Sequence, residues 1–188
     1  MDYTVAKATF DKSKKLRLAL RRKWKEGPTA LVVMLNPSAG ATKDDPTLRR
    51  LTELLDAIGF GGYTVCNWSP FISADPKAMM AYMNQVYSGS PSAVRRAMKL
   101  NLMTLEREVE AADKIIAAWG NDFPASMKAG DALSVYTAKI LTLLMDGYRG
   151  DLYCFGVTKH GAPKHPLARG RSRVPNGAKI VPWIGRHT

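Results

Sequence analysis

Short runs of consecutive apolar residues recur along the chain, and between them lie longer segments in which apolar residues return every three or four positions. Continuous runs are typical of strands covered on both faces, and the longer spacing is typical of helices that pack on a sheet. The runs predict strands over 30–35, 63–67, 114–118 and 151–155, and the spacing predicts helices over 46–58, 91–112 and 131–146. Residues 68–90 are predicted to form a loop with a short helix at 76–86.

Two short strands are predicted around Asp11, because residues 16–20 alternate apolar and other side chains; a helix is the alternative for this segment. Strands that alternate with helices are typical of α/β proteins. We therefore predict a single α/β domain over residues 1–188, a three-layer α/β/α sandwich with a mostly parallel central sheet. Residues 1–28 would form an N-terminal β-hairpin extension, and residues 156–179 a basic loop.

Polar and aromatic side chains follow each of the four predicted parallel strands. In an open parallel sheet, ligands bind outside the carboxyl ends of the strands. Because those ends meet at one edge, we expect the residues after them to converge on a binding site. The candidates are Asn36, Pro37 and Ser38 after the first strand, Asn67, Trp68 and Phe71 after the second, Trp119 and Asn121 after the third, and His160 and His165 after the fourth.

Each candidate also has a purely structural interpretation. Asn36 could turn the chain, Asn67 could cap the following loop, Trp119 could belong to the core, and the histidines could be exposed loop residues. Asp44 and Asp45 are most simply the cap of the helix that follows them, and we favour that interpretation. A site is favoured for the candidates as a group, because their four segments share one predicted edge.

The formal net charge of +12 and the isoelectric point of about 9.9 favour a polyanionic partner, nucleic acid first; a merely soluble basic protein is the alternative. Residues 1–25 carry nine lysines and arginines, and residues 152–188 carry seven with no acidic residue. A cationic loop beside a binding site can position a phosphate backbone, although a solvated tail is an equal alternative. The candidate nucleic-acid contacts are Lys159, Lys164, Arg169, Arg171 and Arg173.

Several other classes of protein are disfavoured. Cys66 and Cys154 lie in apolar runs and cannot form a four-cysteine site, and a reducing cytoplasm fits such a chain. The sequence holds no Walker, G-x-G-x-x-G or G-x-S-x-G motif, and the amino terminus lacks a signal pattern. No stretch approaches the roughly 18 apolar residues of a membrane span. Asp44, Asp45, His160 and His165 lack a known metal-ligand spacing, so no metal is predicted.

Five segments together resemble the domain of unknown function 1643 family, over most of the chain from about Leu16 to Leu167. They are residues 34–38, 44–50, 65–67, 118–120 and 161–167. The same pattern resembles, more distantly, the uracil-DNA glycosylase superfamily. That resemblance implies an α/β/α sandwich in which a first strand end positions water, a second reads the base, and a His-Pro loop contacts the base and enters the duplex.

On this resemblance, Asn36 corresponds to the water-positioning residue, Asn67 to the base-reading residue, and His165 to the histidine of the final loop. Leu167 would be the residue that enters the duplex. Two departures stand out, since Ser38 replaces the usual glycine and Leu167 the usual serine. The implied activity is that of a DNA glycosylase-like hydrolase acting in DNA repair or modification.

Such an enzyme flips its base out of the stack and cleaves the N-glycosidic bond. We expect Trp68, Phe71 or Trp119 to stack on the base, His165 to donate to it, and Lys164 and Arg169 to hold flanking phosphates. The residues named imply no metal or organic cofactor. DNA is the predicted partner, with RNA left open, for a cytoplasmic monomer that does not bind membranes. The alternatives are a non-catalytic nucleic-acid-binding module and another base- or nucleotide-modifying enzyme.

Overall fold

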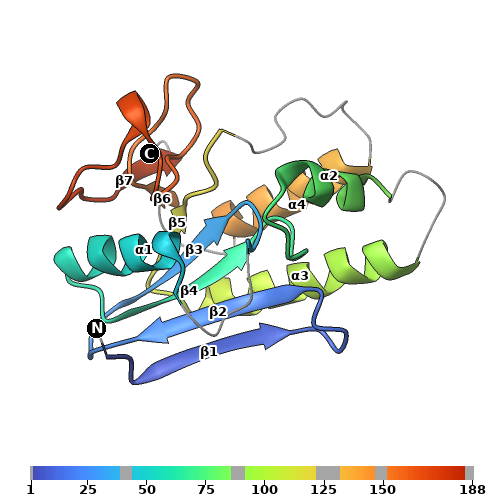
Figure 1. Ribbon diagram of the computed structural model, residues 1–188, viewed down its shortest axis with the longest axis horizontal. Coiled ribbons are helices and arrows are strands. Elements are labelled where there is room, and N and C mark those ends of the chain that lie inside the picture. Colours follow the sequence, from blue (N-terminus) through green and yellow to red (C-terminus); the bar gives the residue numbers. More distant parts are fainter. Residues whose placement is uncertain (1, 39–43, 86–91, 122–131, 147–151, 185–188) are drawn as a thin grey trace.

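The computed structural model describes residues 2–38, 44–85, 92–121, 132–146 and 152–184 (Figure 1). The predicted strands and helices all occur, within a few residues of their expected bounds. The strands are β1 Val5–Phe10, β2 Arg17–Lys23, β3 Thr29–Met34, β4 Gly62–Asn67, β5 Lys114–Ala117, β6 Leu152–Cys154 and β7 Val181–Ile184. The α-helices are α1 Pro46–Ala57, α2 Pro76–Asn84, α3 Ser92–Ala111 and α4 Ala132–Asp146, and a 3-10 turn spans Gly170–Ser172.

The seven strands form one mixed sheet in the order β1-β2-β4-β3-β5-β6-β7. Strands β4, β3, β5 and β6 are parallel to one another, whereas β1, β2 and β7 pair antiparallel. The predicted α/β class is confirmed and the four central strands are parallel, but the sheet as a whole is mixed rather than mostly parallel. The predicted hairpin extends the sheet through β2 beside β4, and β7 closes the other edge beside β6.

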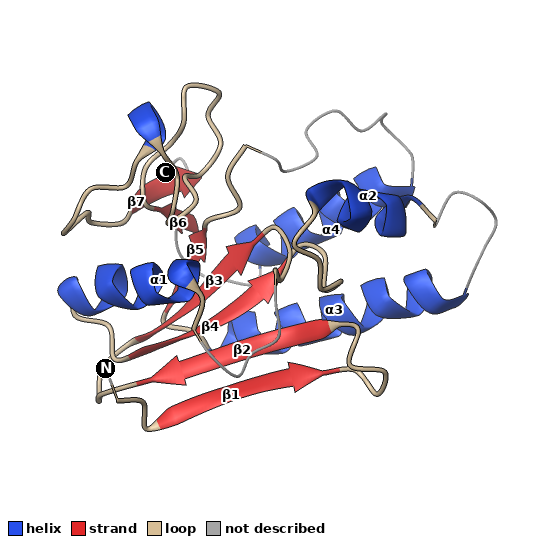
Figure 2. Cartoon of the chain, viewed as in Figure 1, coloured by secondary structure: helices blue, strands red, loops and turns tan. Residues whose placement is uncertain are grey.

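Helices cover both faces of the sheet, as Figure 2 shows. On one face α1 packs Leu51 and Leu55 against Val32 and Val65. On the other face, a second apolar cluster joins α2, α3 and α4 to the sheet, with Leu105 of α3 among its buried residues. Burial on both faces explains the continuous apolar runs of the central strands.

The longest described helix, α3, is amphipathic. Val94, Met98 and Leu105 are buried on its inner face, while Arg95 and Lys99 are exposed. Among the described residues, no helix combines the length and the apolar composition needed to cross a bilayer.

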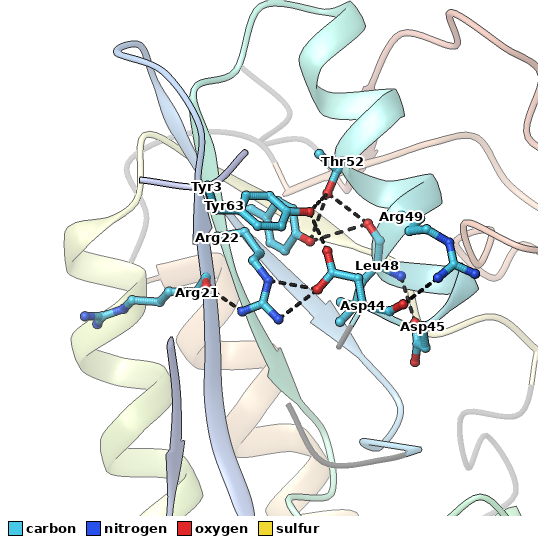
Figure 3. A network of polar contacts seen from close by, with 9 residues as sticks. All are labelled: Tyr3, Arg21, Arg22, Asp44, Asp45, Leu48, Arg49, Thr52 and Tyr63. Carbon is cyan, nitrogen blue, oxygen red and sulfur yellow. Dashed lines mark hydrogen bonds and ion pairs between the residues drawn. The ribbon is translucent and has the colours of Figure 1, made fainter. Parts of the chain in front are cut away.

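A buried polar network ties the hairpin to the start of α1 (Figure 3). The Arg22 guanidinium donates through Nε to Asp44 Oδ1 at 2.9 Å and pairs with it through Nη2 at 2.8 Å. The Tyr3 hydroxyl donates to the other Asp44 oxygen and also contacts Thr52, which in turn contacts the Tyr63 hydroxyl. Asp44 is therefore a structural residue, as the sequence favoured, although it binds a buried cation rather than capping the helix.

Candidate functional site

The topology places a cavity at the carboxyl ends of the parallel strands. From β3 the chain passes to β4 on one side and later to β5 on the other side, so the strand order reverses around β3. Ligands of open α/β sheets bind at such a switch point. The cavity there has a volume of about 570 Å³. Its lining includes seven of the predicted site residues: Asn36, Ser38, Asn67, Trp119, Asn121, His165 and Arg169.

The side chain of Asn36 is held by hydrogen bonds that its amide nitrogen donates to backbone carbonyls. Nδ2 donates to the carbonyl of Ser73 at 2.7 Å and to that of Pro37 at 3.3 Å. Because both partners are acceptors, the assignment of nitrogen and oxygen in this side chain is determined by its contacts. The Asn36 side chain therefore offers its oxygen, an acceptor, to a cavity ligand.

Asn67 lies at the end of β4 and is only 1% exposed. Its Oδ1 accepts a hydrogen bond from Arg17 Nη2 at 3.4 Å, and its backbone carbonyl accepts one from Asn101 Nδ2 at 2.8 Å. Its Nδ2 has no hydrogen-bond partner among the described residues. A buried donor without a partner costs about 1–3 kcal/mol, so this amide group is suited to a ligand.

Arg17 is a site residue that the sequence did not identify. It opens β2, is 6% exposed and lines the cavity. Burial lowers the pKa of its guanidinium to about 10, against the opposing influence of the Asp45 carboxylate. The side chain therefore remains a cation at neutral pH. Nothing distinguishes Arg17 in the sequence from the other cations of residues 1–25, because its burial depends on the strands around it.

His165 is held at the cavity by its own loop. Its Nδ1 accepts a hydrogen bond from the backbone N–H of Leu167 at 3.1 Å. In the neutral imidazole the proton then resides on Nε2, which makes that atom a donor. Gly120 lies beside this histidine with φ of +79°, and a Cβ on it would lie 3.4 Å from the His165 Cβ. The glycine therefore allows both an unusual backbone conformation and a close approach.

Three hydrogen bonds hold the loop that carries His165, one inside the loop and two from other elements. Inside the loop, the N–H of Thr158 donates to the carbonyl of Ala162 at 2.8 Å. After β5, the N–H of Gly120 donates to the carbonyl of Pro163 at 3.0 Å. From β7, Trp183 Nε1 donates to the carbonyl of Gly161 at 2.9 Å. The histidine thus rests on contacts from separate strand ends, which fixes it better than an isolated loop would.

Asp45 confirms the predicted helix cap and also lines the cavity. Its Oδ1 accepts from the N–H of Leu48 at 2.8 Å, and its Oδ2 accepts from Ser38 Oγ at 3.1 Å. Within the described ranges, no group of three or more histidine, cysteine, aspartate or glutamate residues forms a metal-binding cluster. The two cysteines are buried, and burial raises the pKa of each thiol.

Three predicted substrate contacts, Trp68, Phe71 and His160, lie outside the cavity lining. Trp68 is fully buried, and its Nε1 donates to Thr137 Oγ1 at 2.9 Å, so it belongs to the core. Phe71 stacks on Tyr82 with ring centroids 4.3 Å apart, outside the cavity lining. His160 is exposed on the loop surface. Of the three predicted aromatic platforms, only Trp119 lines the cavity.

Pro37 also lies outside the cavity lining, since it is buried and its carbonyl accepts from the N–H of Ser73 at 2.8 Å. It supports Asn36 rather than facing a ligand. Four other polar side chains of the lining were missed by sequence reasoning, namely Thr47, Ser73, Thr158 and Ser172. Thr158 Oγ1 donates to Asn121 Oδ1 at 2.7 Å, which orients that amide. Single serines and threonines in loops carry no sequence signal that separates them from ordinary turn residues.

A second, cationic groove adjoins the cavity. It has a volume of about 600 Å³ and is lined by Arg50, Arg169 and Arg173, with no carboxylate among its described lining residues. Arg169 lines both spaces. Arg50 is anchored, since its Nη2 donates to the carbonyl of Val174 at 3.0 Å and its Nη1 pairs with the exposed carboxylate of Glu53 at 3.2 Å. We call this space the arginine groove.

The predicted nucleic-acid contacts divide between the arginine groove and the surface. Arg169, Arg173 and the 39%-exposed Leu167 line the groove. Lys159 and Arg171 are exposed outside both spaces. Lys164 is also outside both linings. Its side chain lies beside Gly156, where a Cβ added to that glycine would contact the lysine carbons. Arg50 was missed because it belongs to a helix far from the basic loop in sequence.

Fold and site together define an α/β protein with a polar cavity at the carboxyl ends of its parallel strands and a cationic groove beside it. The chain belongs to the family described as "Protein of unknown function (DUF1643)", whose model matches residues 17–167. The predicted membership of this family is thereby confirmed. Comparison with curated proteins and comparison with solved structures each found no match. The likeness to uracil-DNA glycosylases stays a prediction.

Proposed function

We propose that this protein is a DNA glycosylase-like hydrolase, which receives a flipped base in the cavity and cleaves its N-glycosidic bond. One observation carries the proposal. A cavity lined by Asn36, Asn67 and His165 shares a wall, at Arg169, with a groove lined by three arginines and no described carboxylate. Such a pairing suits a ligand that is polar and heterocyclic at one end and carries phosphates at the other.

The cavity has the size and surface that a nucleobase requires. Its volume of about 570 Å³ falls within the roughly 300–1,000 Å³ of small-molecule sites. The indole of Trp119 supplies an aromatic wall, and flipped bases stack on such side chains. Amide and imidazole groups supply hydrogen bonds to the base. Arg50, Arg169 and Arg173 would bind the phosphates of the flanking nucleotides, which position a strand without reading its sequence.

The proposed reaction is a hydrolysis at the sugar carbon. A water oxygen forms the new bond to C1′ while the bond from C1′ to the base nitrogen breaks, and its electron pair leaves with the base. The transition state is cationic at the sugar, as in other glycoside hydrolyses. The oxygen of Asn36 orients the water, and Asp45 adds negative charge to the same lining. The attacking water gives a proton to the solvent. The departing base takes up a proton from the solvent.

His165 stabilises the charge that develops on the departing base. Its Nε2–H donates to the base, because its Nδ1 is occupied by the N–H of Leu167. Removing one such donor costs about 2.7–4 kcal/mol of barrier, or about 100- to 1,000-fold in rate. The histidine therefore acts through hydrogen bonding and need not carry a charge.

The test measures base release from oligonucleotides. Single- and double-stranded oligonucleotides carrying different normal and damaged bases are incubated with the protein, and abasic sites and free bases are quantified. We expect the release of at least one kind of base. The rate of release should fall by about 100-fold or more in Asn36→Ala and His165→Ala. His160→Ala is the matched control, because this histidine is exposed outside the cavity lining, and it should retain full activity.

Two outcomes would overturn the proposal. One is full activity in His165→Ala on the preferred substrate. The other is an absence of release from every base together with tight, salt-sensitive binding, which would identify a non-catalytic nucleic-acid-binding module.

A further inference from the structure

The orientation of the Asn67 amide limits what the cavity can recognise. An asparagine side chain offers one acceptor and two donor hydrogens. Here the acceptor Oδ1 faces Arg17 Nη2 at 3.4 Å. A flipped amide would place its N–H groups against the guanidinium, which has no acceptor. The donor Nδ2 is therefore left for the cavity, where it is buried and has no partner among the described residues.

Arg17 adds further donors beside the same amide. The guanidinium carries five N–H donors and no acceptor. It lines the cavity together with Asn67, and the 3.4 Å contact keeps the two groups adjacent. Burial lowers its pKa only to about 10, so it does not lose its proton at neutral pH. This part of the cavity wall, which we call the donor edge, consists of Asn67 Nδ2 and the Arg17 guanidinium.

We propose that the donor edge selects bases that present two adjacent acceptors, an unprotonated ring nitrogen next to a carbonyl oxygen. Guanine presents N7 and O6 in this way, and cytosine presents N3 and O2. Arginine and asparagine or glutamine are common readers of base edges because they form such paired contacts. The inference rests on the proposed function in that it takes the ligand to be a base.

The same donor edge disfavours uracil and thymine. In both bases an N–H group separates the two carbonyl oxygens, so every pair of neighbouring edge atoms includes a donor. An N–H that faces a buried donor leaves both groups without partners, and each such group costs about 1–3 kcal/mol. The resemblance to uracil-DNA glycosylases would imply a pyrimidine that carries a ring N–H. The base expected from the donor edge is a different one, because it lacks an N–H at that position.

The test compares nucleosides by calorimetric titration of the intact protein. Deoxyguanosine and deoxycytidine are set against thymidine and deoxyuridine, and against 7-deazadeoxyguanosine and 3-deazadeoxycytidine, in which a C–H replaces the ring acceptor. We expect deoxyguanosine or deoxycytidine to bind about tenfold tighter than thymidine and deoxyuridine. The deaza analogue of the preferred nucleoside should bind with about tenfold lower affinity. These analogues test the inference without any change to the protein.

A variant tests the same edge from the side of the protein. Asn67→Asp is nearly isosteric and replaces the donor with an acceptor, while Arg17 supplies a counter-charge that supports folding. We expect this variant to lose the preference for deoxyguanosine or deoxycytidine over thymidine and deoxyuridine. Ser134→Ala is a matched control, because Ser134 lies on α4 and is absent from the cavity lining, and it should keep the wild-type preference.

Three results would overturn the inference: equal or tighter binding of deoxyuridine, equal binding of the deaza analogues, or no measurable nucleoside binding. Inorganic phosphate is included as a probe, and competition by phosphate at the affinity of the nucleosides would identify an anion site and also overturn it. Base release is measured separately. Release of uracil or thymine would leave the proposed hydrolase intact while the donor edge fails, and selective binding without release would do the reverse.

Discussion

Two buried arginines on the same strand have different surroundings. Arg22 and Arg17 both lie in β2 and are 3% and 6% exposed. Arg22 pairs with the carboxylate of Asp44 at 2.8 Å within a network that links β2 to α1. Arg17 donates to the neutral amide of Asn67 at 3.4 Å and lines a cavity. Arg22 thus belongs to a polar network that joins two elements of the fold, whereas Arg17 belongs to the lining of a cavity.

The contrast follows from where each residue lies along β2. Arg22 pairs across the sheet with Tyr63, near the start of β4, and reaches the residues just before α1. Arg17 lies at the opposite end of the strand, beside the carboxyl ends of the parallel strands. That edge is where an α/β sheet places its ligands. One strand therefore contributes both to the buried polar network and to the cavity lining.

The largest expected effect on this comparison comes from removing the counter-ion of Arg22. Asp44→Ala leaves a buried guanidinium without its carboxylate, and we expect the free energy of unfolding to fall by about 3–5 kcal/mol. Denaturant titration measures this loss. Glu26→Ala is the control, because Glu26 pairs with Lys23 at the surface, and such pairs contribute about 0–1 kcal/mol. A similar small loss in Asp44→Ala would show that the network is not structural.

The second prediction concerns Arg17 itself. Arg17→Met removes a cation whose charge is disfavoured by burial but also the donor to Asn67 Oδ1, so we expect the free energy of unfolding to fall less than in Asp44→Ala. Nucleoside binding to the cavity should weaken by about tenfold or more, because the donor edge loses its cation. Arg22→Met should show the opposite pattern, with a large loss of stability. Equal destabilisation by both substitutions would remove the distinction between the two arginines.

The third prediction compares two glycines near His165. Gly120 and Gly161 have φ of +79° and +77°, but only a Cβ on Gly120 would meet the histidine, at 3.4 Å. Substitution by alanine should cost each protein about 1–2 kcal/mol of stability, because of the left-handed backbone. Gly120→Ala should also lower base release, by up to about 100-fold for a displacement of about 1 Å. Equal activity in the two variants would show that the glycine contact does not position His165.

The smallest expected effect concerns Asp45. Asp45→Ala removes the helix cap and should lower the free energy of unfolding by about 1 kcal/mol. Asp45→Asn keeps a good cap but removes the negative charge near Arg17, so stability should change by only a few tenths of a kcal/mol. A difference in ligand binding between Asp45→Asn and wild type would then report the charge alone. Similar stability in the two variants would contradict the capping role.

The features predicted well from sequence are those that local chemistry determines. The start of α1 follows from Asp45 and Pro46, since the cap bond reaches only three residues along the chain. The convergence of Asn36, Asn67 and His165 follows from strand order, because carboxyl ends of parallel strands share an edge. The antiparallel pairings of β2 with β4 and of β6 with β7 depend on contacts between distant segments. These two pairings were not predicted.

The placement of Trp68 outside the cavity lining has a geometric cause. The N–H of Trp68 donates to the carbonyl of Met34 at 2.8 Å, so strand pairing continues one residue beyond β4. Side chains alternate along a strand, and Trp68 therefore follows Cys66 toward the core formed with α3 and α4. Asn67, between them, faces the cavity. Arg17 was missed for a related reason, because residues 16–20 are buried throughout although their sequence alternates like a half-exposed strand.

The arginine groove crosses the boundary of the family match. The matched region ends at residue 167, while Arg169 and Arg173 lie after it. The cavity residues Asn36, Asn67 and His165 all lie within it. Arg50, the third arginine of the groove, lies inside the matched region, so the groove is built from both parts of the chain. If the proposed function holds, exchanging the segment after Leu167 would change the affinity for phosphates through Arg169 and Arg173, while Asn36, Asn67 and His165 stay in place.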